Sequence, residues 1–300
     1  MSDGLVIETK DLKKSYGNVE ALRGLNLHVR AGSICAFLGR NGAGKTTAMK
    51  ILLGMAHADG GQAAVFGLPA DAADQGVEIR RRTAFVSEEK DLFPSMTAGE
   101  MIRFTAAFYP RWRGDLEQRY VREFELPLDR KVKALSRGMR TKLALLLALC
   151  RGAELLMLDE PTSGLDPAVT EQVLQAIVSH VAGGGMTVLF SSHQIAEAEQ
   201  IADHVAIIDR GREAVTGALE DLRENYRRIQ VVFANAAPET APRAPGIRNV
   251  RRSGRVMMLL ASSGVDGIVE EARRLNPVSV DVTPVTLKEI FLEAVGGDEK

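Results

Sequence analysis

Gly39-Arg40-Asn41-Gly42-Ala43-Gly44-Lys45-Thr46-Thr47 is the most informative stretch of the sequence. The apolar run Ile34–Leu38 before it is typical of a buried strand. The apolar residues after it have the spacing of a helix that packs on a core, and they are Met49, Ile51, Leu52 and Leu53. A strand, a glycine-rich loop and a helix in this order match the phosphate-binding pattern G-x-x-x-x-G-K-S/T.

The residues of this loop have the properties that polyphosphate binding requires. Glycines let backbone N–H groups come close to phosphate oxygens, and the N-terminus of the helix adds partial positive charge. Lys45 is predicted to reach the β- and γ-phosphates, and Thr46 to offer its hydroxyl to Mg²⁺. The alternative is an ordinary glycine turn into a helix, but it leaves the Lys and Thr in register unexplained. The predicted nucleotide-binding residues are Gly39, Asn41, Gly42, Ala43, Gly44, Lys45, Thr46 and Thr47.

Composition places the chain among globular proteins. Its 300 residues suggest about two domains, with 45% hydrophobic and 26% charged residues. A formal net charge of −1 gives no electrostatic case for nucleic acid as a partner. The two cysteines, Cys35 and Cys150, lie in apolar runs and are predicted to be core residues rather than a disulfide or a metal site.

No segment of the sequence predicts secretion or membrane insertion. The N-terminus has no basic region followed by an apolar stretch. The longest apolar run, Leu143–Cys150, is far shorter than the ~20 residues that span a bilayer. We therefore expect a cytoplasmic chain, to which another chain supplies any membrane part.

Two further apolar runs end in polar residues suited to nucleotide chemistry. Leu155–Leu158 predicts a buried strand that ends at Asp159 and Glu160, and Thr187–Ser191 predicts another that leads to His193. Ligands bind at the carboxyl ends of strands in open α/β sheets. Asp159 is predicted to hold a water of the Mg²⁺ shell, and Glu160 to accept a proton from the water that attacks the γ-phosphate. Two acids alone could be a solvated turn and a lone His is often structural, but the strand position favours a γ-phosphate contact for His193.

The remaining segments of the first 220 residues indicate an α/β core with an added antiparallel sheet and an inserted helical subdomain. Strand-like runs at residues 5–8 and 21–29 predict an antiparallel sheet before the loop, and residues 91–150 predict an inserted helical subdomain. Ser136 suits the N-cap of a helix, whose N-terminus could also hold an anion. Tyr16, on a turn before the loop, is as consistent with packing as with stacking on a nucleotide base.

Taken together, residues 5–220 resemble the ATP-binding subunits of ABC transporters. Gly39–Thr46 resembles the Walker A loop and Leu155–Asp159 the Walker B strand, with Glu160 as its acid. Ser163-Gly164-Leu165-Asp166 is similar to the D-loop, His193 to the switch histidine and Tyr16 to the adenine-stacking aromatic. The resemblance implies a P-loop NTPase fold of the ABC-type ATPase class, with an antiparallel β subdomain and an inserted helical subdomain.

Two positions depart from the family pattern. The usual signature Leu-Ser-Gly-Gly-Gln reads Leu-Ser-Arg-Gly-Met at residues 135–139, which keeps Ser136 and Gly138 as implied phosphate contacts but puts a ribose contact at Met139 in doubt. The loop glutamine that usually joins Mg²⁺ to the transmembrane partner aligns with Glu88, whose carboxylate can also bind Mg²⁺ or its water. Both departures are similar to those of subunits that serve ABC-2 exporter permeases.

The resemblance implies an ATPase, with ATP and Mg²⁺ as cofactors, that drives a separate transmembrane permease, with a lean toward export. It implies a head-to-tail dimer of like or unlike subunits, peripheral on the cytoplasmic face of the membrane, that closes on ATP and opens after hydrolysis. A soluble ABC ATPase that acts on a ribosome or nucleic acid is the alternative, although such proteins usually carry two cassettes. A nucleotide-binding partner without turnover is a third, against which Glu160 and His193 argue.

Beyond the family motifs, a second domain is expected. We predict an ABC ATPase domain at residues 1–222 and a small α+β accessory domain at residues 223–300. In the latter, strands are expected at 228–233, 256–260 and 278–282, with helices at 265–275 and 287–295. Its sequence shows no convergent titratable cluster, so packing or dimer contact is favoured over ligand sensing.

Overall fold

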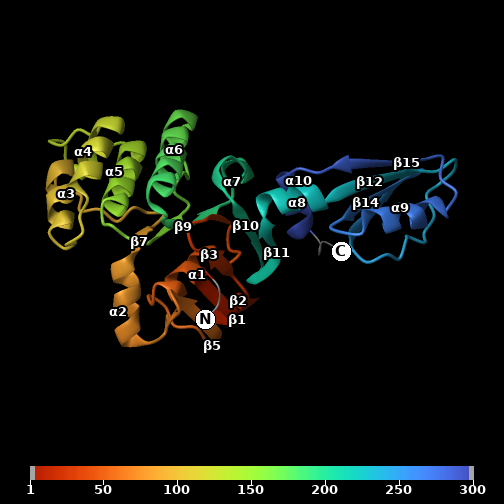
Figure 1. Ribbon diagram of the computed structural model, residues 1–300, viewed down its shortest axis with the longest axis horizontal. Coiled ribbons are helices and arrows are strands. Elements are labelled where there is room, and N and C mark those ends of the chain that lie inside the picture. Colours follow the sequence, from red (N-terminus) through yellow and green to blue (C-terminus); the bar gives the residue numbers. More distant parts are fainter. Residues whose placement is uncertain (1–3, 297–300) are drawn as a thin grey trace. The chain divides into compact units, whose positions relative to one another are not determined.

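The computed structural model describes residues 4–296, which divide after Thr216 into two compact units (Figure 1). The expected domain boundary at residue 222 lies inside helix α8 (Leu219–Asn225). Among the helices of the described residues, none has the length and apolarity of a membrane span.

The first unit is built on a six-stranded sheet with the order β11-β10-β4-β9-β8-β7. From β10 to β7, neighbouring strands are parallel, so their carboxyl ends lie on one edge. The central strands β4, β8 and β9 are buried along their whole length, as their continuous apolar runs require. The strands are β4 (Ile34–Leu38), β7 (Thr83–Val86), β8 (Leu155–Asp159), β9 (Thr187–Ser192), β10 (His204–Asp209) and β11 (Arg212–Ala218).

A second, antiparallel sheet of the same unit has the order β2-β1-β5-β6, with β3 also paired to β1. Helix α1 (Lys45–Leu52) packs with both sheets, because its Met49 and Leu52 belong to one core that includes Ile7 of β1 and Phe37 of β4. The predicted antiparallel subdomain is therefore present. Its strands are β1 (Leu5–Tyr16), β2 (Val19–Leu25), β3 (His28–Arg30), β5 (Gly60–Val65) and β6 (Leu68–Pro69).

Residues 91–150 contain the helices α3, α4 and α5, as expected for the inserted helical subdomain. In Figure 1 α3, α4, α5 and α6 lie side by side at one end of this unit. Cys35 and Cys150 are free and buried, as predicted. The helices are α2 (Ala73–Arg82), α3 (Ala98–Ala106), α4 (Gly114–Glu123), α5 (Arg137–Leu149), α6 (Pro167–Gly184) and α7 (Ile195–Ile201), with a 3₁₀ turn at Val132–Ala134.

The second unit is a four-stranded antiparallel sheet, β13-β14-β12-β15, whose core packs against helix α9. The strand Ile247–Ser253 was not predicted, because it is a half-exposed edge strand with three arginines and little apolar alternation. Strand β11 was missed for a similar reason. The remaining elements are β12 (Arg227–Val232), β13 (Ile247–Ser253), β14 (Val256–Ala261), β15 (Ser279–Pro284), α9 (Val265–Arg273) and α10 (Leu287–Ala294).

Candidate functional site

The loop between β4 and α1 requires glycine at two positions. Gly44, directly before α1, has φ of 108°, and a Cβ on it would lie 2.5 Å from the Ala21 carbonyl oxygen. A Cβ on Gly39 would lie 2.6 Å from the Ile208 carbonyl oxygen. Only glycine fits such backbone contacts without displacement. The loop folds around the buried Lys45, whose Nζ donates to the Gly39 carbonyl at 2.7 Å.

Tertiary structure joins this loop to the end of the neighbouring acidic strand. The Thr46 Oγ1 donates to Asp159 Oδ2 at 2.7 Å across 113 residues of sequence. Strands β8 and β9 are parallel neighbours, and Asp159 pairs with Ser191. The Ser191 Oγ donates to Asp159 Oδ1 at 2.7 Å and accepts from the Glu160 N–H at 2.9 Å. Both carboxylate oxygens of Asp159, which is 2% exposed, therefore have hydrogen-bond donors.

Glu160 lies between a lysine and a histidine. Its Oε1 is 3.2 Å from Lys45 Nζ, and its Oε2 is 2.7 Å from His193 Nδ1. Glu160 and Lys45 are only 7% and 6% exposed, so little water solvates their charges. Each charge is instead compensated by the other. The Glu160 backbone has φ of 48°, in the left-handed region that residues with a side chain rarely adopt. A carboxylate held this way beside a phosphate loop can accept a proton.

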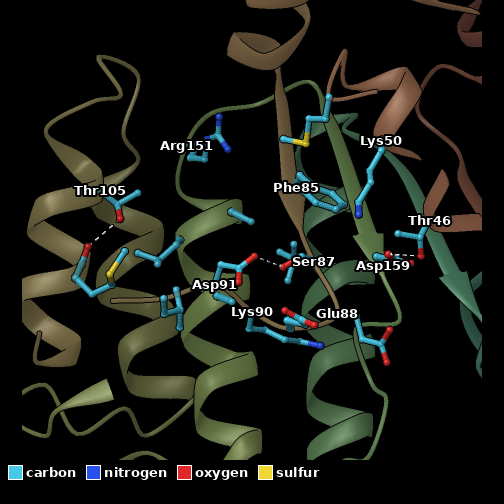
Figure 2. Close-up of a pocket in the computed structure, with 18 of the residues that line it drawn as sticks. Thr46, Lys50, Phe85, Ser87, Glu88, Lys90, Asp91, Thr105, Arg151 and Asp159 are labelled. Atoms are coloured by element: carbon cyan, nitrogen blue, oxygen red, sulfur yellow. Dashed lines mark hydrogen bonds between the residues drawn. The ribbon is translucent and has the colours of Figure 1, made fainter. Parts of the chain in front are cut away.

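A groove of about 570 Å³ opens beside these residues, between the sheet end and the helices α3 and α5. Figure 2 shows Thr46 and Asp159 on one side of it and Thr105 on the other. Glu88, which is exposed, lies in the segment after β7 that lines the groove. Within residues 4–296, no three His, Cys, Asp or Glu side chains form a metal-type cluster. The three predicted metal-binding residues, Thr46, Asp159 and Glu88, all line this one groove.

Three predicted residues lie elsewhere in the first unit. Tyr16 ends β1 with half of its surface exposed, and Lys14 Nζ lies 5.3 Å from its ring centroid. Ser136 is the N-cap of α5, as predicted, and accepts from the Met139 N–H at 3.1 Å. A Cβ on Gly138 would lie 3.2 Å from Val169 of α6. Within residues 4–296, no hydrogen bond or ion pair joins these three to the Lys45 loop.

Sequence reasoning missed Ser191 and Lys90. Ser191 could have been found as a hydroxyl residue at the end of an otherwise apolar strand beside the acidic one. Lys90 is 9% exposed, and its Nζ donates to the Glu160 carbonyl at 3.3 Å. Burial lowers the pKa of its ammonium, and the nearby Arg137 lowers it further. No sequence signal marks a buried lysine inside the polar run Glu88–Asp91.

In the sequence, Arg137 is visible only as a departure from the usual signature pattern. Its Nη2 lies 3.4 Å from Ser163 Oγ, and a Cβ on Gly164 would overlap its guanidinium. The arginine therefore lies against the 163–166 turn, next to the strand end that carries Glu160. This contact could not be read from the sequence because 26 residues separate its two partners.

Comparison with known proteins gives a consistent result. Residues 22–163 match the family model described as ABC transporter. The chain is 31% identical to the bacitracin transport ATP-binding protein BcrA of Bacillus licheniformis, over 97% of this chain and 98% of that one. It is 36% identical to the daunorubicin/doxorubicin resistance ATP-binding protein DrrA of Streptomyces peucetius, over 78% of this chain and 72% of that one.

A solved ATP-binding subunit of an ABC transporter has the same fold. It is 30% identical, with a TM-score of 0.65, over 73% of this chain and 92% of that one. The phosphate loop, the acidic strand end and the histidine meet within this fold. The chain belongs to the ATP-binding proteins of ABC transporters and is an ABC-type ATPase.

Proposed function

We propose that this chain hydrolyses ATP to power export by a separate membrane permease. The observation that supports it best is the position of the Glu160 carboxylate, which contacts both Lys45 and His193 and follows Asp159 directly. A base, a cation for the phosphates and a metal-binding carboxylate are the parts that ATP hydrolysis needs. Their convergence favours turnover over nucleotide binding alone.

The residues of the site fit Mg²⁺. Thr46 and Asp159 bring a hydroxyl and a carboxylate oxygen within 2.7 Å of each other, and these are the hard oxygen donors that Mg²⁺ accepts alongside phosphate oxygens and water. Glu88, on the same groove, is a third proposed ligand, directly or through water. When bound, Mg²⁺ would neutralise charge on the β- and γ-phosphates.

The residues of the site have distinct proposed roles in hydrolysis. The N–H groups of residues 39–47 cradle the phosphates, and Lys45 exchanges its carbonyl acceptor at Gly39 for phosphate oxygens. Glu160 accepts the proton of the attacking water, which requires an ionised carboxylate. His193, with its Nδ1 on Glu160, orients that carboxylate and presents the other edge of its ring to the γ-phosphate. Tyr16 is proposed to stack on the adenine.

We further propose a head-to-tail dimer in which ATP binds the loop of one subunit and the α5 N-terminus of the other. The Ser136 side chain caps one amide of α5, and helix N-termini attract anions such as a γ-phosphate. Ser136 and Gly138 would then contact phosphate across the interface. ATP would close the dimer and hydrolysis would release it. Like or unlike subunits satisfy this scheme equally.

Export and the permease are proposed from the relatives. The names of BcrA and DrrA link them to bacitracin transport and to daunorubicin/doxorubicin resistance. We place the permease contact at the groove beside Glu88, because the groove reaches from the helices α3 and α5 to Thr46 and Asp159. The chain would then work at the cytoplasmic face of the membrane, held there by its permease.

Two experiments test this function. Purified wild-type protein should hydrolyse ATP in a Mg²⁺-dependent manner, whereas Lys45→Ala should lose hydrolysis because its phosphate contact is gone. Glu160→Gln should elute as a dimer in ATP, since it binds ATP and hydrolyses it only very slowly. A monomeric Glu160→Gln in ATP would contradict the proposed clamp.

The partner is identified separately. Tagged Glu160→Gln, extracted from membranes in mild detergent, should co-purify with a polytopic membrane protein in stoichiometric amount. Recovery of ribosomes or nucleic acid without a membrane protein would overturn the transport proposal and leave the ATPase chemistry in place.

A further inference from the structure

We infer that Lys90 is a positioning residue that fixes the main chain of Glu160 and thereby directs its carboxylate during hydrolysis. The inference rests on the proposed role of Glu160 as the base. Lys90 lies in the segment after β7, 70 residues from Glu160 in sequence. It lines the groove together with Glu88 and Asp91 (Figure 2).

The contact between the two residues is direct and buried. The Lys90 Nζ donates to the main-chain oxygen of Glu160 at 3.3 Å, and the residue is 9% exposed. Its own backbone is in the left-handed region, with φ of 52°, and its N–H donates to the Ser87 carbonyl at 3.2 Å. With this turn, the Lys90 side chain lies buried instead of in solvent.

Glu160 needs such support because its backbone conformation is unfavourable. A residue with a side chain persists at φ of 48° only where its surroundings fix it. The Glu160 N–H donates to the Ser191 hydroxyl. The Glu160 carbonyl accepts from both the Ser163 N–H, at 3.2 Å, and the Lys90 Nζ. If the peptide rotated toward a relaxed conformation, the carboxylate would leave Lys45 and His193.

The chemistry of the acceptor distinguishes positioning from simple stability. A buried ammonium is costly, and a carboxylate partner would compensate it better than a neutral carbonyl does. The carboxylates of Glu88, Asp159 and Glu160 lie close enough to favour the charged form of Lys90, yet its Nζ donates to the main-chain carbonyl of Glu160, the proposed base. A lysine here is therefore better explained by the orientation of Glu160 than by a gain in folding free energy.

The test compares steady-state ATP hydrolysis of full-length variants. Lys90→Met keeps the aliphatic stem and removes the donor, so kcat should fall roughly tenfold, with KM for ATP within about twofold of wild type. Lys90→Arg restores a cationic donor and should recover most of kcat. Lys142→Met, which removes a half-buried lysine from α5, is the matched control and should keep wild-type kcat. Thermal melting of every variant checks that each is folded.

A second comparison shows whether Lys90 acts through the Glu160 carboxylate. In single-turnover hydrolysis, Lys90→Met should add no further loss to Glu160→Gln, because the group it directs is already gone. A Lys90→Met enzyme with wild-type kcat, a loss expressed in KM alone, or no recovery in Lys90→Arg would each overturn the inference. A wild-type chain without ATPase activity would instead refute the proposed function itself.

Discussion

Replacing Ser191 with Ala should damage both the folding and the activity of the first unit. The hydroxyl is fully buried and bridges two groups, donating to Asp159 Oδ1 at 2.7 Å and accepting from the Glu160 N–H at 2.9 Å. Alanine removes both hydrogen bonds and leaves a buried carboxylate oxygen and a buried amide without those partners. The change is small in volume, so packing is almost conserved.

The size of the effect follows from these two contacts. Each buried polar group left without a partner costs about 1–3 kcal/mol, and the charged carboxylate belongs at the upper end. We therefore expect the free energy of unfolding to fall by about 4–6 kcal/mol, a large part of the 5–15 kcal/mol typical of a folded domain. ATP hydrolysis should fall as well, because Ser191 links the positions of Asp159 and Glu160.

Urea unfolding followed by the fluorescence of Trp112, the single tryptophan, measures the loss in the first unit. The control is Thr187→Val, at the other end of β9, whose Oγ1 accepts one neutral bond from the Gly32 N–H at 3.0 Å. It should cost about 1 kcal/mol and leave kcat unchanged. A stability loss in Ser191→Ala no greater than in the control would refute the reasoning.

Gly44→Ala should abolish nucleotide binding, because its Cβ would lie 2.5 Å from the Ala21 carbonyl at a φ of 108°, and titration with a fluorescent ATP analogue would detect residual binding if the loop tolerated it. A pH effect is expected at His180, where burial and then the cations Arg113 and Arg119 lower the pKa of the imidazole below its ordinary 6.5. The unfolded state then binds the proton more readily, so this contribution to stability is present above about pH 6.5 and is lost as pH falls below it. Thermal melting at pH 7.5 and 5.5 should therefore show a smaller drop for His180→Gln than for wild type, and equal drops would contradict the prediction.

The sequence alone determined the family and most of the fold. The register of the 39–47 loop between an apolar strand and a helix, followed by an apolar strand ending at Asp159, can serve few purposes other than phosphate and metal binding. Buried strands such as Ile34–Leu38 and Leu155–Asp159 are visible in sequence because both faces must be apolar. Half-exposed edges such as Ile247–Ser253 are not, because little of their surface must be hydrophobic.

Only the tertiary structure decided which polar groups meet. The adjacency of β8 and β9 brings Ser191 to Asp159, and the turn at residues 87–90 brings Lys90 to the main chain of Glu160. Such contacts join residues 32 and 70 positions apart, and local pattern carries no information about them. Residue types that chemistry demands at fixed spacing can thus be read from the chain, whereas the supports that hold them in place depend on how the chain folds back on itself.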